Sequence, residues 1–189
     1  MRDREASEAG FTLIEMMVTV ALIAILAALA LPAFFGETRK AKAAAEVQPM
    51  FNDLRVRLEQ YLQETGSYPP TIGEGSMFPA SAPGPTPVPL GTLRTEWQTA
   101  KVRISGMDQV RCRYTWATGR PSPLDDANVG DVAHGTPPAG FGFSAPVTDW
   151  YYLLAQCDMD GANDGTVDTF SWYFTSSIDP TIRKLNDGN

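Results

Sequence analysis

The feature that most constrains this chain is an uninterrupted apolar run near its start, at residues 16–35. None of its side chains is charged, and Thr19 is the only strongly polar one. At about 1.5 Å per residue, a helix of this length spans roughly 30 Å, which is the thickness of the hydrocarbon core of a bilayer. The sequence therefore predicts a membrane-spanning helix, with the carboxylate of Glu15 directly before it.

The order of the segments around this run differs from that of an ordinary secretory signal. Such a signal has a small-residue cleavage site after its apolar stretch. Here the polar segment MRDREASEAG comes first, and its small last residue, Gly10, precedes the apolar run. Cleavage after Gly10 would remove residues 1–10 as a leader peptide and keep the apolar helix, residues 11–35, in the mature chain.

The hexapeptide GFTLIE, which begins at Gly10, resembles the class III signal of type IV pilins and related pseudopilins. The resemblance includes the glycine at the cut, Phe11 as the first mature residue, Glu15 as the fifth, and Pro32 within the apolar run. It implies that a prepilin peptidase cleaves after Gly10 and that the new amino terminus, on Phe11, is methylated. The resemblance is strong from Gly10 to about Tyr68 and loose beyond.

Glu15 lies directly before the apolar run, where its carboxylate is expected to have a partner that compensates its charge. A charged side chain at the centre of a bilayer costs on the order of 2.5–3.5 kcal/mol, so such residues usually have a partner. On a helix, Phe11 and Glu15 are four residues apart and share one face. The amine that cleavage exposes on Phe11 could pair with Glu15 of the same subunit. The pilin resemblance instead implies pairing with Phe11 of a neighbouring subunit during filament assembly, and solvation by lipid headgroups is the remaining alternative.

The charges on either side of the apolar run give conflicting indications about topology. The leader carries two basic and three acidic side chains, whereas Arg39, Lys40 and Lys42 follow the run. The positive-inside rule would therefore place the C-terminal part in the cytoplasm. The pilin resemblance implies the opposite orientation. We follow the resemblance and expect a single-pass inner-membrane precursor, with its globular domain outside the cytoplasm, that later joins a cell-surface filament.

The helix is expected to continue beyond the membrane as an amphipathic half over residues 36–66. Kinks are expected at Pro32 and Pro49, because proline removes a backbone donor and clashes with the preceding turn. Gly66 favours the end of the helix. One apolar stripe follows the helical period, at Val47, Phe51, Leu54, Leu58, Tyr61 and Leu62. This stripe needs a covering element from residues 67–189, the expected β-rich head domain.

Strand-like runs in the head domain supply that covering element. They lie at residues 101–105, 110–118, 149–157 and 166–175. Alternation is clearest in the second run, where one face would hold Val110, Cys112, Tyr114 and Trp116. We predict an α+β fold in which about four antiparallel strands pack on the second half of one long helix. This is also the pilin fold that the resemblance implies.

The two cysteines, Cys112 and Cys157, form an even pair in the domain that is expected outside the cytoplasm. Cysteine pairs in oxidising compartments usually form disulfides. We therefore predict a disulfide between them, with two buried free thiols as the alternative.

An acid-rich turn, DMDGANDGTVD, follows Cys157. Its carboxylates could bind a structural Ca²⁺ and belong to Asp158, Asp160, Asp164 and Asp168. Their spacing fits a calcium loop of the EF-hand type only in part. The alternative is a hairpin turn in which Asp, Asn and Gly supply the required backbone conformations. Ca²⁺ is the single cofactor that the sequence suggests.

The rest of the sequence favours a structural protein over an enzyme. It contains no nucleophile–base pair, phosphate-binding loop or two-histidine site, and its net charge of −7 argues against a nucleic-acid groove. The hypothesis is therefore a major or minor pilin of a type IV pilus that serves motility, adhesion or DNA uptake. The partners that the resemblance implies are other pilin subunits, the prepilin peptidase, the lipid bilayer before assembly, and an inner-membrane assembly platform with its ATPases.

Two alternative functions stay open at this point. One is a type II secretion system pseudopilin, whose short filament acts as a piston for exported proteins. The other is a minor pilin at the filament tip that binds DNA or a surface. Candidate residues for such a basic surface are Lys101, Arg103, Arg111 and Arg113.

Overall fold

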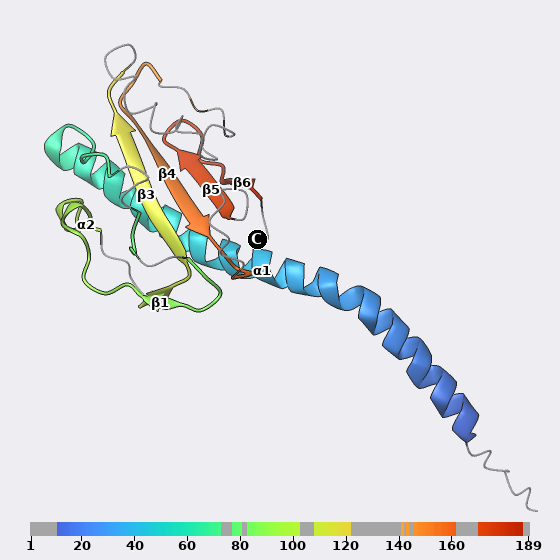
Figure 1. Ribbon diagram of the computed structural model, residues 1–189. Coiled ribbons are helices and arrows are strands. Elements are labelled where there is room, and N and C mark those ends of the chain that lie inside the picture. The colour runs from blue at the N-terminus through green and yellow to red at the C-terminus, as the bar shows by residue number, and fades with distance from the viewer. Residues whose placement is uncertain are drawn as a thin grey trace, which may run out of the picture. The chain divides into compact units, whose positions relative to one another are not determined.

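In the computed structural model, a long α-helix precedes a small antiparallel sheet (Figure 1). The structure describes residues 11–72, 77–80, 83–102, 108–121, 141, 143, 146–161 and 170–186. Its elements are α1 (Leu13–Thr65), β1 (Val88–Pro89), α2 (Thr95–Thr99), β2 (Gln109–Val110), β3 (Cys112–Gly119), β4 (Trp150–Cys157), β5 (Ser171–Ser176) and β6 (Arg183–Leu185). This architecture confirms the predicted α+β fold. The chain divides into two compact units, Met1–Glu37 and Thr38–Asn189, and α1 contributes to both.

The helix α1 is one uninterrupted element of 53 residues. It runs through Pro32 and Pro49 without a break, and the kinks expected at these prolines stay a prediction. It ends before Gly66, whose φ of 81° is the left-handed conformation that glycine readily adopts after a helix. The Gly66 amide donates to the carbonyl of Leu62 at 2.8 Å, which satisfies one of the last carbonyls of the helix.

Within the second unit, α1 buries the apolar stripe that the sequence predicts. Four members of the stripe have no exposed surface: Val47, Phe51, Leu54 and Leu58. They share a hydrophobic cluster with residues of β3, β4 and β5, among them Tyr114, Leu153 and Tyr173. Fully burying one such side chain is worth about 1.5–3 kcal/mol, so this cluster holds the sheet on the helix.

The larger sheet has the strand order β3-β4-β5-β6, and all its neighbouring strands are antiparallel. The predicted alternation is confirmed, since Cys112, Tyr114 and Trp116 belong to the cluster that packs on α1. The other face of the sheet is buried too, in a second cluster that includes Trp150 and Phe174. Every residue of β4 is buried, because this strand lies between β3 and β5 and packs on both faces. This explains why its sequence, WYYLLAQC, has no polar face.

The strands differ from the prediction at several positions. The run at residues 110–118 is two strands, because Arg111 separates β2 from β3. At the start of the run at 101–105, Lys101 and Val102 lie in no strand, and the remaining residues of that run are outside the described part of the chain. The fourth strand of the sheet is instead β6, whose three residues, RKL, are too few and too charged to indicate a strand.

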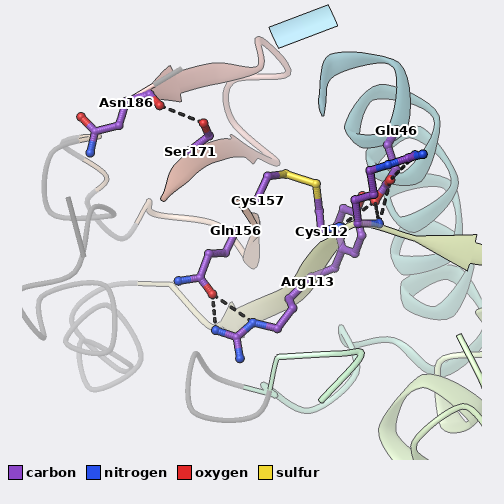
Figure 2. Close-up of a disulfide and its surroundings, with 9 residues drawn as sticks. Glu46, Cys112, Arg113, Gln156, Cys157, Ser171 and Asn186 are labelled. Atoms are coloured by element: carbon purple, nitrogen blue, oxygen red, sulfur yellow. Dashed lines mark hydrogen bonds and ion pairs between the residues drawn. A yellow bond between two sulfur atoms is a disulfide. The ribbon is translucent and has the colours of Figure 1, made fainter. Parts of the chain in front are cut away.

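The break at Arg111 is explained by the carboxylate of Glu46, which α1 places against the start of β3 (Figure 2). The Arg111 amide lies 2.9 Å from both Glu46 oxygens, and the Cys112 amide donates to Oε1 at 2.9 Å. The Tyr114 hydroxyl donates to the same oxygen at 2.9 Å. Burial and the nearby carboxylate raise the pKa of Tyr114. Because two consecutive amides bond to a side chain, the backbone ladder is interrupted between β2 and β3.

The outer edge of β3 is paired along much of its remaining length by the chain that follows α1. Tyr114 and Phe78 exchange backbone hydrogen bonds of 2.7 and 2.9 Å. Farther along β3, the Trp116 carbonyl accepts from the Ile72 amide at 3.1 Å. Unpaired strand edges are templates for aggregation, so these contacts protect the sheet on this side. On the opposite side, the sheet ends in the short, basic β6.

Glu46→Ala should destabilise the second unit markedly, because it leaves two backbone amides and the Tyr114 hydroxyl without their buried acceptor. We expect a loss of about 3 kcal/mol in the free energy of unfolding. The measurement is urea denaturation of the full chain in detergent, followed by tryptophan fluorescence. Glu46→Gln keeps one acceptor oxygen and should lose less.

The matched control for this prediction is Glu64→Ala. Glu64 lies on the same helix but forms an exposed ion pair with Lys101, so its loss should stay below about 1 kcal/mol. Equal destabilisation by Glu46→Ala and Glu64→Ala would contradict the role assigned to Glu46.

Candidate functional site

The N-terminal half of α1 exposes apolar side chains on all sides. Every residue from 11 to 31 is exposed. The large apolar side chains of this half are between 47% exposed, at Met16, and 75%, at Phe11. By length and composition, α1 is the one helix among the described residues that could cross a membrane, and the described residues bury none of its most apolar window. Apolar surface costs about 25 cal/mol per Å² in water, so this half requires a lipid or protein partner.

A local cap formed by Thr12 and Glu15 begins α1. The Thr12 hydroxyl accepts a hydrogen bond from the Glu15 amide at 3.3 Å and donates to Oε2 of Glu15 at 3.4 Å. Thr-x-x-Glu is the sequence of a capping box, and the bond from the Glu15 amide to the Thr12 hydroxyl is the first half of that motif. In the second half the acid accepts from the backbone amide of the cap residue, whereas here it accepts from the Thr12 hydroxyl. A carboxylate in the first turn also interacts favourably with the helix dipole. Within a single chain, the Glu15 carboxylate therefore accepts a long hydrogen bond from the residue that caps its own helix.

The predicted cleavage site lies next to this cap. Phe11 directly precedes Thr12 and is exposed. Gly10 and the rest of the predicted leader lie outside the described residues. Cleavage after Gly10 and methylation of Phe11 therefore stay predictions. Because α1 begins at Leu13, the proposed new amino terminus would lie within two residues of the helix start.

The predicted disulfide between Cys112 and Cys157 is present (Figure 2). The two residues are directly opposite in the ladder of β3 and β4, with Cα atoms 4.4 Å apart. This separation is typical of a pair whose amides do not bond to each other across an antiparallel ladder. The Cys112 amide is accordingly directed away from β4 and donates its hydrogen bond to Glu46 on α1. Both cysteines are fully buried, so the disulfide is part of the core between sheet and helix.

The structure describes three of the four basic residues considered for a DNA-binding surface. Each of the three has an acceptor within the chain. Lys101 pairs with Glu64, Arg111 with Glu46, and Arg113 with the side chain of Gln156. Figure 2 shows the Arg113–Gln156 contact beside the disulfide. Arg103 lies outside the described residues. Binding a nucleic acid through the three described residues would compete with these contacts.

The structure describes only the first part of the acid-rich turn. Asp164 and Asp168 lie outside the described residues, and Asp160 is partly buried. Asp158 is buried, and its Oδ1 accepts a hydrogen bond from the Gly161 amide at 2.7 Å. Gly161 has a φ of 71°, so the described part has the features of a turn closed by an aspartate side chain. No group of three metal-ligating side chains occurs among the described residues, and calcium binding by this turn stays a prediction.

Two residues whose hydrogen bonds hold the structure together were not predicted from the sequence. Thr12 could have been found from the spacing Thr-x-x-Glu before an apolar run, which is a signature of a helix start. Glu46 could have been found from its place on the buried face of α1. It lies three residues after Ala43 and four before Met50, and both of these are buried. An acid on such a face needs a buried hydrogen-bond partner.

Comparisons with known proteins agree with this geometry. Residues 6–31 match the family described as "Prokaryotic N-terminal methylation motif". The type IV major fimbrial protein FimA of Dichelobacter nodosus is 46% identical over 55 residues, which are 29% of this chain and 34% of that protein. The type IV major pilin protein PilE1 of Neisseria gonorrhoeae is 31% identical over 140 residues, which are 67% of this chain and 65% of that protein. No solved structure matches the chain.

The methylation motif, the long helix with its sheet, and the fimbrial relatives define one class of protein. The chain belongs to the type IV pilin superfamily. It spans about a third of the length of the matched fimbrial protein and 65% of the matched pilin.

Thr12→Ala should loosen the first turn of α1, because it removes both hydrogen bonds of the cap. Loss of such a cap typically costs about 1 kcal/mol, which is about a fivefold change in an equilibrium. Amide hydrogen exchange of residues 13–16, measured by NMR on the full chain in micelles, should therefore accelerate about fivefold. Thr12→Ser is the matched control and should retain the protection. Unchanged exchange in Thr12→Ala would contradict the assignment of the cap.

Proposed function

We propose that this chain is a structural subunit of a type IV pilus, cleaved after Gly10, methylated on Phe11 and assembled through the N-terminal half of α1. The observation that carries the proposal is the exposed apolar helix, which the described part of the chain does not cover. The match to the methylation motif over residues 6–31 supports the processing steps. The relatives are named as a fimbrial protein and a major pilin, which supports a structural rather than a catalytic role.

In this proposal the apolar half of α1 has two successive environments. The lipid bilayer covers it first, when the chain is a single-pass inner-membrane precursor with its second unit outside the cytoplasm. A prepilin peptidase removes the leader there. An inner-membrane assembly platform with its ATPases then moves the subunit into the filament, where α1 helices of other subunits replace the lipid. Lipid tails and neighbouring helices both cover the apolar surface of α1, so the transfer exchanges one set of apolar contacts for another.

Glu15 changes its partner during that transfer. In the single chain, its carboxylate accepts one bond of 3.4 Å from Thr12, which is long for a hydroxyl donor and therefore easily replaced. The α-amino group of Phe11 in a neighbouring subunit would offer a charge-assisted bond, which is roughly twice as strong as a neutral one. In apolar surroundings, this pair would neutralise both charges. It would also fix the axial position of one subunit against the next.

The named relatives and the contacts of the basic residues favour a subunit of the pilus filament over the two alternatives. The named relatives are a fimbrial protein and a pilin, which supports a pilus subunit over a type II secretion pseudopilin. A DNA-binding tip subunit is less well supported, because Lys101, Arg111 and Arg113 have acceptors in their own chain.

Glu15→Gln should block incorporation into filaments while leaving membrane insertion intact. The amide keeps an acceptor for the cap but lacks the charge that pairs with the Phe11 amine. A hydrogen bond to a charged group is worth about 1.5–3 kcal/mol, so filament yield should fall by about tenfold or more. The measurement is an immunoblot of sheared filaments and of the membrane fraction, in cells whose sole copy of the protein is the variant.

The matched control is Glu37→Gln, which removes the next acid of α1 beyond the apolar run and should leave filament yield unchanged. Wild-type filament yield from Glu15→Gln would refute the pairing with Phe11. An equal loss of filaments in both variants would also refute it, because the defect would then follow from any loss of acid on α1.

A further inference from the structure

A polar pocket of about 360 Å³ opens between the C-terminal end of α1 and the ends of β3 and β4 that lie nearest to it. Two tyrosines line it, Tyr61 on α1 and Tyr68 just after the helix. The pocket is also lined by Arg120, after β3, and Asp149, before β4. The whole pocket lies within the second unit of the chain. A volume of this size falls within the usual range of small-ligand sites.

One wall of the pocket is fixed by hydrogen bonds between β3 and residues 69–71. The Thr118 hydroxyl donates to the carbonyl of Pro69 at 2.7 Å, and its amide donates to the hydroxyl of Thr71 at 2.9 Å. The indole of Trp116 donates to the carbonyl of Pro70 at 3.1 Å. A wall held in this way is formed before any ligand arrives, which reduces the entropy cost of binding.

The floor of the pocket and one of its tyrosines are also held in place. A Cβ atom at Gly119 would lie 2.2 Å from the ring of Trp150, so only glycine fits where β3 passes this ring. The Tyr68 hydroxyl donates to Glu59 at 3.0 Å, and its ring packs edge-on against Tyr151 with centroids 5.0 Å apart. The orientation of Tyr68 is therefore fixed from two sides.

Two polar groups of the pocket remain available for a ligand. Asp149 and Tyr61 are partly buried, and no hydrogen bond among the described residues uses the Asp149 carboxylate or the Tyr61 hydroxyl. Arg120 is exposed and also lines the pocket, and it already has an interaction within the chain. A ligand that fits these groups must both donate and accept hydrogen bonds. It must also present an apolar face to the tyrosine rings, which are apolar bodies with polar tips.

The local charge argues against an anionic ligand. Besides burial, the negative charges of Glu59 and Asp149 contribute to a raised pKa of Tyr68. The two charged side chains that line the pocket, Arg120 and Asp149, offset each other, so the lining has no net positive charge to attract a phosphate or a carboxylate. These constraints leave a neutral, polyhydroxylated molecule with apolar faces.

We infer that this pocket binds a saccharide, one sugar ring of which packs on the tyrosines while its hydroxyls bond to the Asp149 carboxylate and the Tyr61 hydroxyl. This goes beyond the proposed role as a filament subunit, because it assigns a ligand to the second unit alone. Its test does not depend on filament assembly.

Saturation-transfer NMR tests the inference on the full chain in a detergent without a sugar headgroup. The probes are the methyl glycosides of glucose, galactose, mannose and N-acetylglucosamine. At least one should bind with a dissociation constant on the order of 1 mM, which is typical of ligands of this size. Glucose 1-phosphate should bind more weakly than methyl glucoside, because the charged lining of the pocket, Asp149 and Arg120, offers no net positive charge to the phosphate.

Asp149→Asn and Tyr61→Leu should each weaken binding of that glycoside by about tenfold, while the melting temperature confirms that the variant is folded. Asp108→Asn is the matched control, since Asp108 is an exposed acid that does not line the pocket. Three results would overturn the inference. They are no transfer to any of the four glycosides, equal binding by the folded Asp149→Asn and wild-type chains, and tighter binding of the phosphorylated sugar.

Discussion

The apolar surface of the first half of α1 has no cover in the described part of its own chain, and this constraint determines how the molecule is organised. Residues 11–31 are exposed throughout, whereas the second half of the same helix buries a continuous stripe. One helix therefore serves two purposes. Its first half depends on lipid or on other protein chains, and its second half provides the core on which the sheet packs.

Because the first half contributes nothing to the core, the second unit must be stable through its own contacts. Glu46 is central to that stability, since it accepts two backbone amides at the start of β3 and the Tyr114 hydroxyl. The adjacent Cys112–Cys157 disulfide joins β3 to β4 at the same point. Helix, sheet edge and disulfide thus meet in one small region (Figure 2).

The sequence predicts the helix, the disulfide and the principal strands because each leaves a local signal. The apolar run and the stripe at Val47 to Leu58 follow the helical period, and the two cysteines form an even pair. Features that depend on contacts between distant segments leave no such local signal in the sequence. The second face of the sheet is buried partly by Phe141, from a stretch rich in Gly and Pro that gives no periodic pattern. β6 is too short to be recognised.

The candidate sites also differ in whether their residues are contiguous in the sequence or come from distant segments. The motif around Glu15 is contiguous and could be recognised from residue order alone. Glu46 could be found only in part, because its acceptor role depends on amides more than sixty residues away. The pocket with Tyr61, Arg120 and Asp149 draws on three separate segments, and no spacing in the sequence indicates that they meet.

The central claim is that the exposed apolar helix is retained in the mature chain and forms the assembly element. Intact mass spectrometry of the chain recovered from sheared surface filaments tests it most directly. The account predicts one species that begins at Phe11 and carries one added methyl group. A chain that begins after residue 35 would mean that the apolar run is removed as an ordinary signal. A chain that retains residues 1–10 would mean a plain membrane anchor, and either result would contradict the account.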